Sequence, residues 1–137
     1  MPLTHLLDTS VYCQPLKPKP LPSVIGRWKI LGDETLCTSI FCWAEVRQGL
    51  YLKNSDRLWE AFQEELDGRY PILDFDRASA DHFARINARL RSEGRPKPSL
   101  DILIASTARA HGLILATCNY RDFDGIEGLA VEDWTHP

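Results

Sequence analysis

Short strand-like segments alternate with helical segments along the chain, and this alternation limits the fold more than any other feature of the sequence. The strand-like segments cover residues 3–8, 35–38, 70–75, 113–117 and 129–131. The gaps between the first four of them each hold at least one stretch with helical periodicity or helix-start signals. Alternating strands and helices are typical of layered α/β domains, so we expect one domain over residues 1–137 with a mostly parallel sheet.

Residues that start and stop helices mark the expected helical segments. A short helix is expected to begin within residues 11–13, and four longer ones run from Ser23 to Gly32, Ser39 to Gly49, Ser55 to Leu66, and Asp76 to Glu93. The segment before Ser23 contains four prolines, at positions 15, 18, 20 and 22. Proline fixes the backbone and removes a hydrogen-bond donor, so this segment is predicted to be an extended connection.

One more helix, expected over residues 98–112 with Ser99 as its N-cap, carries a single carboxylate in an otherwise apolar stretch. This carboxylate, Asp101, shares a flank of the helical wheel with Ala105 and Ala108. Burying a carboxylate on an apolar flank is unfavourable unless a charged or hydrogen-bonding group meets it. Two interpretations of Asp101 alone stay open: a favourable charge at the positive end of the helix dipole, or part of a functional site.

Charge and cysteine content exclude several classes of protein. The formal net charge of -3 gives no overall attraction to nucleic acid, but it does not exclude nucleic-acid binding, because the distribution of charge matters more than its sum. The four cysteines form no CxxC pair and lack histidines at zinc-binding spacing, so we interpret them as small buried residues in a reducing compartment. No segment is long and apolar enough to span a bilayer, and the N-terminus has no signal-peptide pattern. These features predict a cytoplasmic protein that does not bind membranes.

Polar side chains that suit metal chemistry follow two of the expected strands. Asp8 comes directly after the first strand, and Asn119 and Asp122 follow the strand that ends at residue 117. Open α/β sheets bind ligands beyond the carboxyl ends of their strands, and Asp101 and Glu45 can reach the same edge from their helices. Gathered carboxylates repel unless a cation lies among them, and oxygen ligands suit Mg²⁺ or Mn²⁺. This pattern predicts a metal site capable of phosphodiester hydrolysis.

Each of these residues also has an ordinary structural interpretation. Asp8 can form an Asx turn or cap the next helix, and Asn119 and Asp122 are common turn residues. Glu45 can form an ion pair with an arginine such as Arg47 or Arg109. Spacing alone leaves these alternatives open.

The order of four motifs resembles that of PIN-domain ribonucleases, and most closely the VapC-type toxins of type II toxin-antitoxin modules. The motifs are Leu-Leu-Asp-Thr-Ser-Val at 6–11, Thr-Ser-Ile-Phe-Cys-Trp-Ala-Glu-Val-Arg-Gln-Gly at 38–49, Asp-Ile-Leu-Ile-Ala at 101–105, and Leu-Ala-Thr-Cys-Asn-Tyr-Arg-Asp-Phe at 115–123. The closing Gly-Leu-Ala-Val-Glu-Asp-Trp at 128–134 fits as well. The resemblance implies a three-layer sandwich with a mostly parallel central sheet, and a Mg²⁺- or Mn²⁺-dependent endoribonuclease.

The resemblance also implies roles for individual residues. Asp8, Glu45 and Asp101 match the family's acidic residues, so Asp8 and Asp101 are expected to ligate the metal, with Glu45 as a further ligand or a base. The family's fourth acidic position falls at Asn119. Because asparagine carries no charge, the number of bound metal ions, one or two, stays open. The polar side chains expected to support the site are those of Ser10, Thr117 and Asp122.

Partners follow from the same resemblance. RNA is the implied substrate, and a basic stretch supplies candidates for holding its backbone, namely Arg85, Arg89, Arg95 and Lys97. A solvated helix face explains that stretch equally simply. A VapB-like antitoxin and a homodimer are also implied, with Trp28, Phe41 and Trp59 as candidates for a hydrophobic antitoxin groove. An RNA-processing nuclease without an antitoxin, or a degenerate PIN fold that only binds RNA or protein, are the alternatives, and the RNA target is not predicted.

Overall fold

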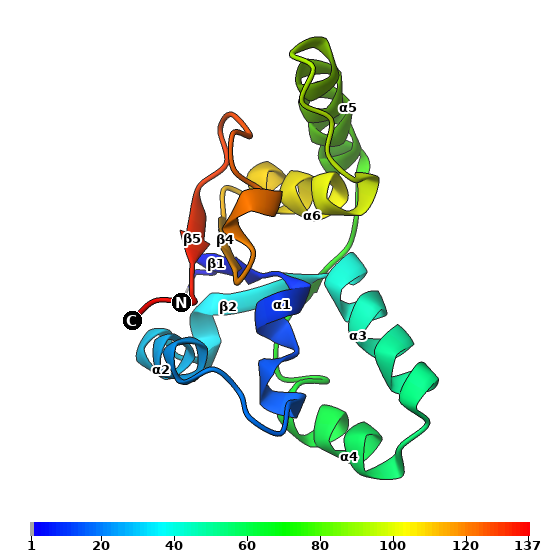
Figure 1. Ribbon diagram of the computed structural model, residues 1–137, viewed down its shortest axis with the longest axis vertical. Coiled ribbons are helices and arrows are strands. Elements are labelled where there is room, and N and C mark those ends of the chain that lie inside the picture. Colours follow the sequence, from blue (N-terminus) through cyan, green and yellow to red (C-terminus); the bar gives the residue numbers. More distant parts are fainter. Residues whose placement is uncertain (1) are drawn as a thin grey trace.

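A five-stranded parallel sheet forms the centre of the protein (Figure 1). The computed structural model describes residues 2–137, so Met1, the first residue of the expected 1–137 domain, lies outside it. The strand order is β3-β2-β1-β4-β5, and every pair of neighbours is parallel. The strands are β1 (His5–Leu7), β2 (Leu36–Ser39), β3 (Ile72–Leu73), β4 (Ile114–Thr117) and β5 (Val131–Asp133). The predicted parallel α/β fold is confirmed.

Six α-helices and three 3₁₀ turns connect these strands within residues 2–137. The helices are α1 (Thr9–Tyr12), α2 (Pro22–Leu31), α3 (Ile40–Lys53), α4 (Asp56–Glu65), α5 (Arg77–Ser92) and α6 (Ser99–Ala110). The 3₁₀ turns are η1 (Gln14–Leu16), η2 (Asp33–Thr35) and η3 (Tyr120–Asp122). Within the part of the chain that the structure describes, no helix has the length and apolar character needed to cross a membrane.

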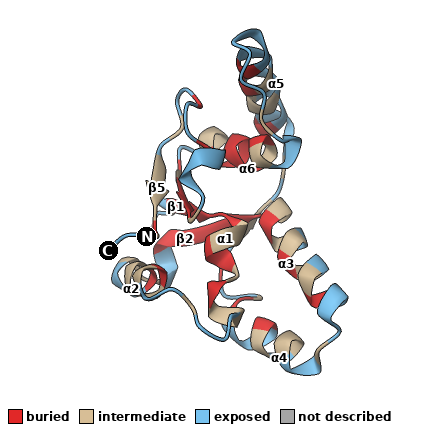
Figure 2. Ribbon diagram, in the orientation of Figure 1, coloured by how far each residue is buried: buried red, intermediate tan, exposed pale blue. Residues whose placement is uncertain are grey.

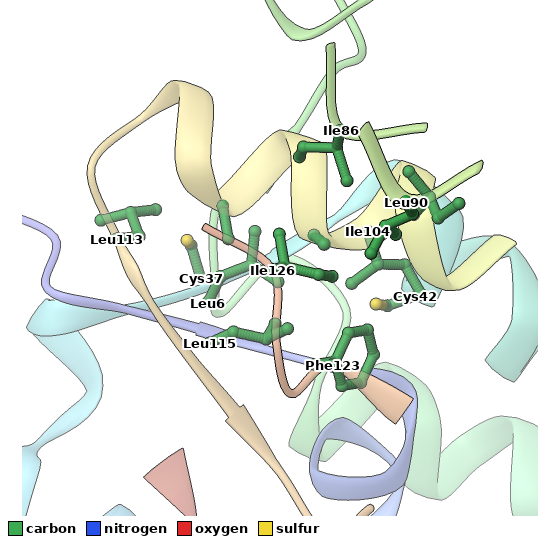
Figure 3. Packing of buried hydrophobic residues seen from close by; sticks show 13 residues of the cluster. Leu6, Cys37, Cys42, Ile86, Leu90, Ile104, Leu113, Leu115, Phe123 and Ile126 are labelled. Atoms are coloured by element: carbon green, nitrogen blue, oxygen red, sulfur yellow. The ribbon is translucent and has the colours of Figure 1, made fainter. Parts of the chain in front are cut away.

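The two faces of the sheet are covered by different helices, which confirms the three-layer arrangement (Figures 1 and 2). Leu6 and its register partner Leu115 pack in one buried cluster with side chains of α5 and α6 (Figure 3). Leu7 and its partner Ala116 pack in the other cluster, with α1, α2 and α4. Neighbouring residues on a strand point to opposite faces, so a fully buried parallel strand is apolar at consecutive positions, as Leu6 and Leu7 are.

Helix α6 is the buried helix that the sequence predicts, and it lies against the sheet. Ala105 and Ala108 are fully buried in the same cluster as Leu6. Two polar side chains on this helix are also buried, and each donates to the main-chain oxygen four residues earlier, Ser106 to Ile102 and Thr107 to Leu103. These internal hydrogen bonds satisfy the hydroxyls, so the helix can bury them among apolar neighbours.

Several predicted element ends were wrong, among them the expected strands over 3–8 and 70–75, which cover only His5–Leu7 and Ile72–Leu73. Helix α6 begins at Ser99, not after it, because the carbonyl of Pro98 already accepts the first helical bond, from the N–H of Ile102. Helix α3 continues past residue 49 and ends at Lys53, because the next residue, Asn54, has a left-handed φ of 50°. The last strand covers 131–133 and not 129–131, because Val131, Glu132 and Asp133 pair in register with β4.

The proline-rich segment is more regular than predicted. Its first part forms the 3₁₀ turn η1, and α2 begins at Pro22, not at Ser23. Proline is favoured in the first helical turn because the N–H that it lacks has no helical partner there. The buried side chain of Gln14 fixes the segment, since its Nε2 donates to the carbonyl of Ser10 and its Oε1 accepts from the N–H of Leu21.

Candidate active site

Asp8 stands at the carboxyl end of the central strand β1 and is buried, with 4% of its surface exposed. Its Oδ1 accepts hydrogen bonds from Ser10 Oγ at 2.6 Å and from the N–H of Val11 at 3.2 Å, and its Oδ2 accepts from Thr117 Oγ1 at 2.6 Å. Burial raises the pKa of Asp8, while the hydrogen bonds from Ser10, Thr117 and Val11 oppose that rise. Asp8 is therefore both the N-cap of α1 and a carboxylate held in one orientation.

Glu45 projects from α3 towards α1 and is half-buried. Its Oε1 accepts a short hydrogen bond from the hydroxyl of Thr9, the residue after Asp8. Neither arginine considered as its partner pairs with it. Arg47 stacks over the ring of Trp43, and Arg109 donates to a main-chain carbonyl in the loop before β5. Within residues 2–137 no basic group lies within ion-pair distance of Glu45, so its charge is not neutralised by the protein there.

Asp101, in the first turn of α6, is influenced by three other carboxylates. Burial, followed by the charges of Asp122, Glu45 and Asp8 in that order, raises the pKa of Asp101 to about 6, although the nearby Lys97 acts to lower it. Electrostatic influence of this kind requires the groups to lie near one another. Four elements that are distant in sequence therefore bring their acids to one edge of the sheet.

The side chains of the acidic residues are not arranged to coordinate a metal ion together. No group of three His, Cys, Asp or Glu side chains within residues 2–137 is arranged tightly enough to hold a metal ion. The chemistry of the donors nevertheless fits Mg²⁺ or Mn²⁺, because the donors are carboxylate oxygens that carry uncompensated negative charge. A divalent cation would relieve the repulsion that raises the pKa of Asp101.

Asn119 and Asp122 follow β4 and take different parts in the site. Asn119 is exposed, and its N–H donates to Thr117 Oγ1 at 2.9 Å, so its main chain extends the hydrogen-bonded group around Asp8. Asp122 ends the turn η3, and its charge is the strongest of the three that act on Asp101. The fourth negative charge at the site thus comes from Asp122, three residues after the position where the sequence has Asn.

Two residues that lie beside the candidate site were given no role in the sequence analysis. One is Thr9, the partner of Glu45, and the other is Asp133, which lies at the carboxyl end of β5 and lines a cleft with Asn119 and Asp122. Hydrogen bonds from the hydroxyl and the N–H of Thr135 lower the pKa of Asp133. The rule that ligands bind beyond strand ends would have singled out Asp133 if the last strand had been placed two residues later.

Most of the basic residues proposed to hold RNA form ion pairs with acidic side chains of the protein. The exposed pairs are Arg85 with Asp81, Arg89 with Glu93 and Glu127, and Arg95 with Glu93. Arg85 and Arg89 also line a large open cleft of about 910 Å³ between α5 and residues 125–128, which contains none of the site's acids. Lys97 differs, because only 16% of its side chain is exposed and its Nζ donates to the carbonyl of Arg121 and to Asp124. Lys97 therefore fastens the η3 loop beside Asp101.

The aromatic residues considered for an antitoxin groove are not equivalent. Trp28 is buried in the core, where its Nε1 donates to the hydroxyl of Tyr70 at 2.8 Å, so it does not line a groove. Phe41 and Trp59 are half-buried, and each packs edge-to-face on a neighbouring ring, Phe75 and Phe62 respectively. Only these two remain open to contact from outside.

Comparison with known proteins gives a consistent result. The family model described as "PIN domain" matches residues 5–129. The chain is 35% identical over 133 residues to the tRNA(fMet)-specific endonuclease VapC of Shigella flexneri, covering 97% of this chain and 99% of the relative. Among solved structures, FitAcB from Neisseria gonorrhoeae matches with a TM-score of 0.89 and 28% identity, covering 98% of this chain and 100% of the other. DNA-bound VapBC from Salmonella typhimurium matches with a TM-score of 0.82 and 30% identity, covering 96% and 98%.

Proposed function

Because this chain belongs to the PIN-domain family, as a VapC-type toxin ribonuclease of a type II toxin-antitoxin module, we propose that Asp8, Glu45, Asp101 and Asp122 form its Mg²⁺- or Mn²⁺-dependent active site. The observation that carries this proposal is the arrangement of acids from four separate elements, in which Ser10 and Thr117 hold Asp8 and the neighbouring Thr9 holds Glu45, while Asp122, Glu45 and Asp8 lie near enough to Asp101 to raise its pKa. Carboxylates that are gathered beyond the carboxyl ends of parallel strands without basic partners favour a bound cation.

Each acid has its own part in phosphodiester hydrolysis. Asp8 and Asp101 would hold the divalent cation, with Glu45 or Asp122 completing its oxygen ligands. When bound, the cation supplies charge that polarises the scissile phosphate and makes water easier to deprotonate. Glu45, which has no basic partner among the described residues and is oriented by Thr9, would accept the proton of the attacking water. Asn119 supports the site through its main chain, and its amide side chain adds a neutral ligand for RNA or metal.

The direct test is cleavage of RNA by the purified chain. We expect cleavage of a structured RNA in Mg²⁺ or Mn²⁺, complete loss on removal of the metal with EDTA, and recovery when Mg²⁺ is added back in excess. Measuring Mn²⁺ binding by calorimetry in the same preparation separates a binding defect from a chemical one. Absence of both Mn²⁺ binding and RNA cleavage in folded protein would refute the proposed active site.

A buried hydroxyl gives a second, more selective prediction. Thr117→Val keeps the shape of the buried side chain but removes the hydrogen bond to Asp8 Oδ2, one of the interactions that lower the pKa of Asp8. Loss of one such charge-assisted bond is worth roughly 1.5–3 kcal/mol, so we expect kcat to fall on the order of tenfold or more. The lower limb of the pH–rate profile should also move to higher pH, which a purely structural defect would not cause.

The matched control for this change is Thr107→Val. Thr107 is also a fully buried threonine, but its hydroxyl donates to a main-chain carbonyl within α6 and to no carboxylate. It should keep the wild-type pH profile. If both valine variants behave alike, Thr117 does not position Asp8.

Inhibition by a partner is part of the proposal. We expect a VapB-like antitoxin to bind this chain, as the solved FitAcB and VapBC assemblies suggest, and we expect the toxin to form a homodimer. Phe41 and Trp59 are the aromatic candidates left for antitoxin contact after Trp28 is excluded. Arg85, Arg89 and Arg95 contribute to RNA binding only if RNA phosphates replace the acids that now pair with them.

A further inference from the structure

A small cleft opens beside the acidic site at the carboxyl ends of β4 and β5. Its volume is about 510 Å³, and its lining residues are Cys118, Asn119, Tyr120, Arg121, Asp122 and Asp133. Two of these, Asn119 and Asp122, belong to the proposed active site. An RNA strand whose phosphate reaches the acids therefore passes this cleft with an adjoining nucleotide.

Tyr120 and Arg121 give the cleft the chemistry of a nucleotide-binding surface. The side chain of Tyr120 is 45% exposed, although a large aromatic ring gains from burial. No other aromatic ring in residues 2–137 stacks on it. Arg121 is exposed, and within the same residues no carboxylate lies within ion-pair distance of its guanidinium, in contrast to Arg85, Arg89 and Arg95. An unpaired ring next to an unpaired cation suits a nucleobase next to its phosphate.

The turn that carries these two residues is anchored on both sides. Phe123, which follows it, is buried in the core cluster beneath α6 (Figure 3). Lys97 holds the turn from outside by donating to the carbonyl of Arg121 and to Asp124. On the inner side the N–H of Asn119 donates to Thr117. The exposed ring and guanidinium therefore project from a fixed main chain, which lowers the entropy lost on binding a ligand.

The depth of the acids limits which RNA can use this cleft. Asp8 is almost completely buried, so a scissile phosphate must enter a recess at the sheet edge. Bases within an A-form duplex are stacked on each other and cannot lie against a protein ring, whereas bases of loops and single strands can.

We propose that Tyr120 and Arg121 form a subsite for one unpaired nucleotide next to the scissile phosphate, with the base stacked on Tyr120 and its phosphate held by Arg121. This inference rests on the proposed ribonuclease function and deepens it, because it assigns the two side chains that contact the nucleotide next to the scissile phosphate. The subsite selects unpaired RNA and tolerates different bases, since every base has a face that can stack.

The test compares variants of the cleft with variants of matched residues elsewhere. Tyr120→Ala removes the ring, Tyr120→Phe retains it, and Arg121→Gln removes the charge. Tyr51→Ala and Arg91→Gln are the controls, because Tyr51 on α3 is also an exposed tyrosine and Arg91 on α5 is also an exposed arginine without a carboxylate at ion-pair distance in residues 2–137. Binding of a fluorescein-labelled single-stranded RNA is measured by anisotropy in EDTA, over a series of salt concentrations. KM and kcat are measured in Mg²⁺ on a hairpin RNA cleaved in its loop.

The two variants should separate the contribution of base stacking from the contribution of charge to RNA binding. Tyr120→Ala should raise Kd and KM about tenfold with little change in the salt dependence of binding, and Tyr120→Phe should match wild type. Arg121→Gln should raise Kd and reduce the slope of log affinity against log salt by about 0.7. Equal Kd and KM in wild type and Tyr120→Ala, or equal cleavage of the hairpin loop and a perfect duplex, would overturn the subsite. Failure of the wild type to cleave any RNA would overturn the proposed function, while the anisotropy data would still decide the subsite.

Discussion

Asp101→Asn is expected to cleave RNA on the order of 10²–10³ times more slowly than wild type near neutral pH in Mg²⁺, and to be at least as stable as wild type in EDTA. Both effects have one cause. Burial and the charges of Asp122, Glu45 and Asp8 raise the pKa of Asp101 to about 6, so its ionised form is disfavoured in the folded protein. Asparagine keeps the shape, removes the repelling charge and removes a metal ligand at the same time. Thermal unfolding in EDTA and initial cleavage rates measure the two effects.

The control for this change is an acid outside the site. Asp56→Asn removes an exposed carboxylate of α4 that has no basic group within ion-pair distance among residues 2–137, and it should leave the cleavage rate unchanged. Asp8→Asn should lower activity as Asp101→Asn does, because it removes the other carboxylate proposed to hold the metal. The variant should stay folded, because the asparagine oxygen can still accept one of the hydrogen bonds that Asp8 accepts. An Asp101→Asn protein that cleaves RNA at the wild-type rate would show that Asp101 does not bind the catalytic metal.

Local sequence rules located the carboxylates of the site better than they located their partners. Asp8 follows from a strand end, and Asp101 from a charge on an apolar helix, since each signal is contained in a few neighbouring residues. Ser10 is a local hydroxyl partner of Asp8, but two other hydroxyl partners lie far away in sequence, as Thr9 does from Glu45 and Thr117 does from Asp8. No local pattern encodes which hydroxyl meets which carboxylate, because the sheet order that joins them is a property of the whole chain.

The wrong predictions also have identifiable physical causes. Asp133 was missed because the ladder with β4, a non-local interaction, fixes the last strand two residues beyond its most apolar part. Lys97 was expected to hold RNA because it lies in a basic stretch. The structure adds that its ammonium group holds the η3 loop, and its contact with RNA stays a prediction. The sequence shows which residues are charged but not which charges are paired. Arg121 was therefore not predicted to bind RNA, although no carboxylate among residues 2–137 lies within ion-pair distance of it.

Metal binding should reverse the pH dependence of stability that Asp101 causes. A raised carboxyl pKa means that the folded state binds a proton more tightly than the unfolded state does. Without metal, the contribution of Asp101 to the free energy of unfolding is therefore greatest below pH about 4 and declines as pH rises to about 6. A divalent cation binds the ionised carboxylates, so Mg²⁺ should stabilise the protein increasingly above pH about 6.

The measurement is Tm across pH 4 to 8 in EDTA and in excess Mg²⁺ for wild type and Asp101→Asn. Asp76 and Asp133 have lowered pKa values and act in the opposite direction, since their stabilisation is lost as pH falls. The difference between the two proteins cancels these terms, because both carboxylates are present in each. In EDTA wild type should lose Tm relative to Asp101→Asn as pH rises from about 4 to about 6, and Mg²⁺ should restore it only in wild type. A difference that is flat over this range, or equal stabilisation of both proteins by Mg²⁺, would place the cation away from Asp101.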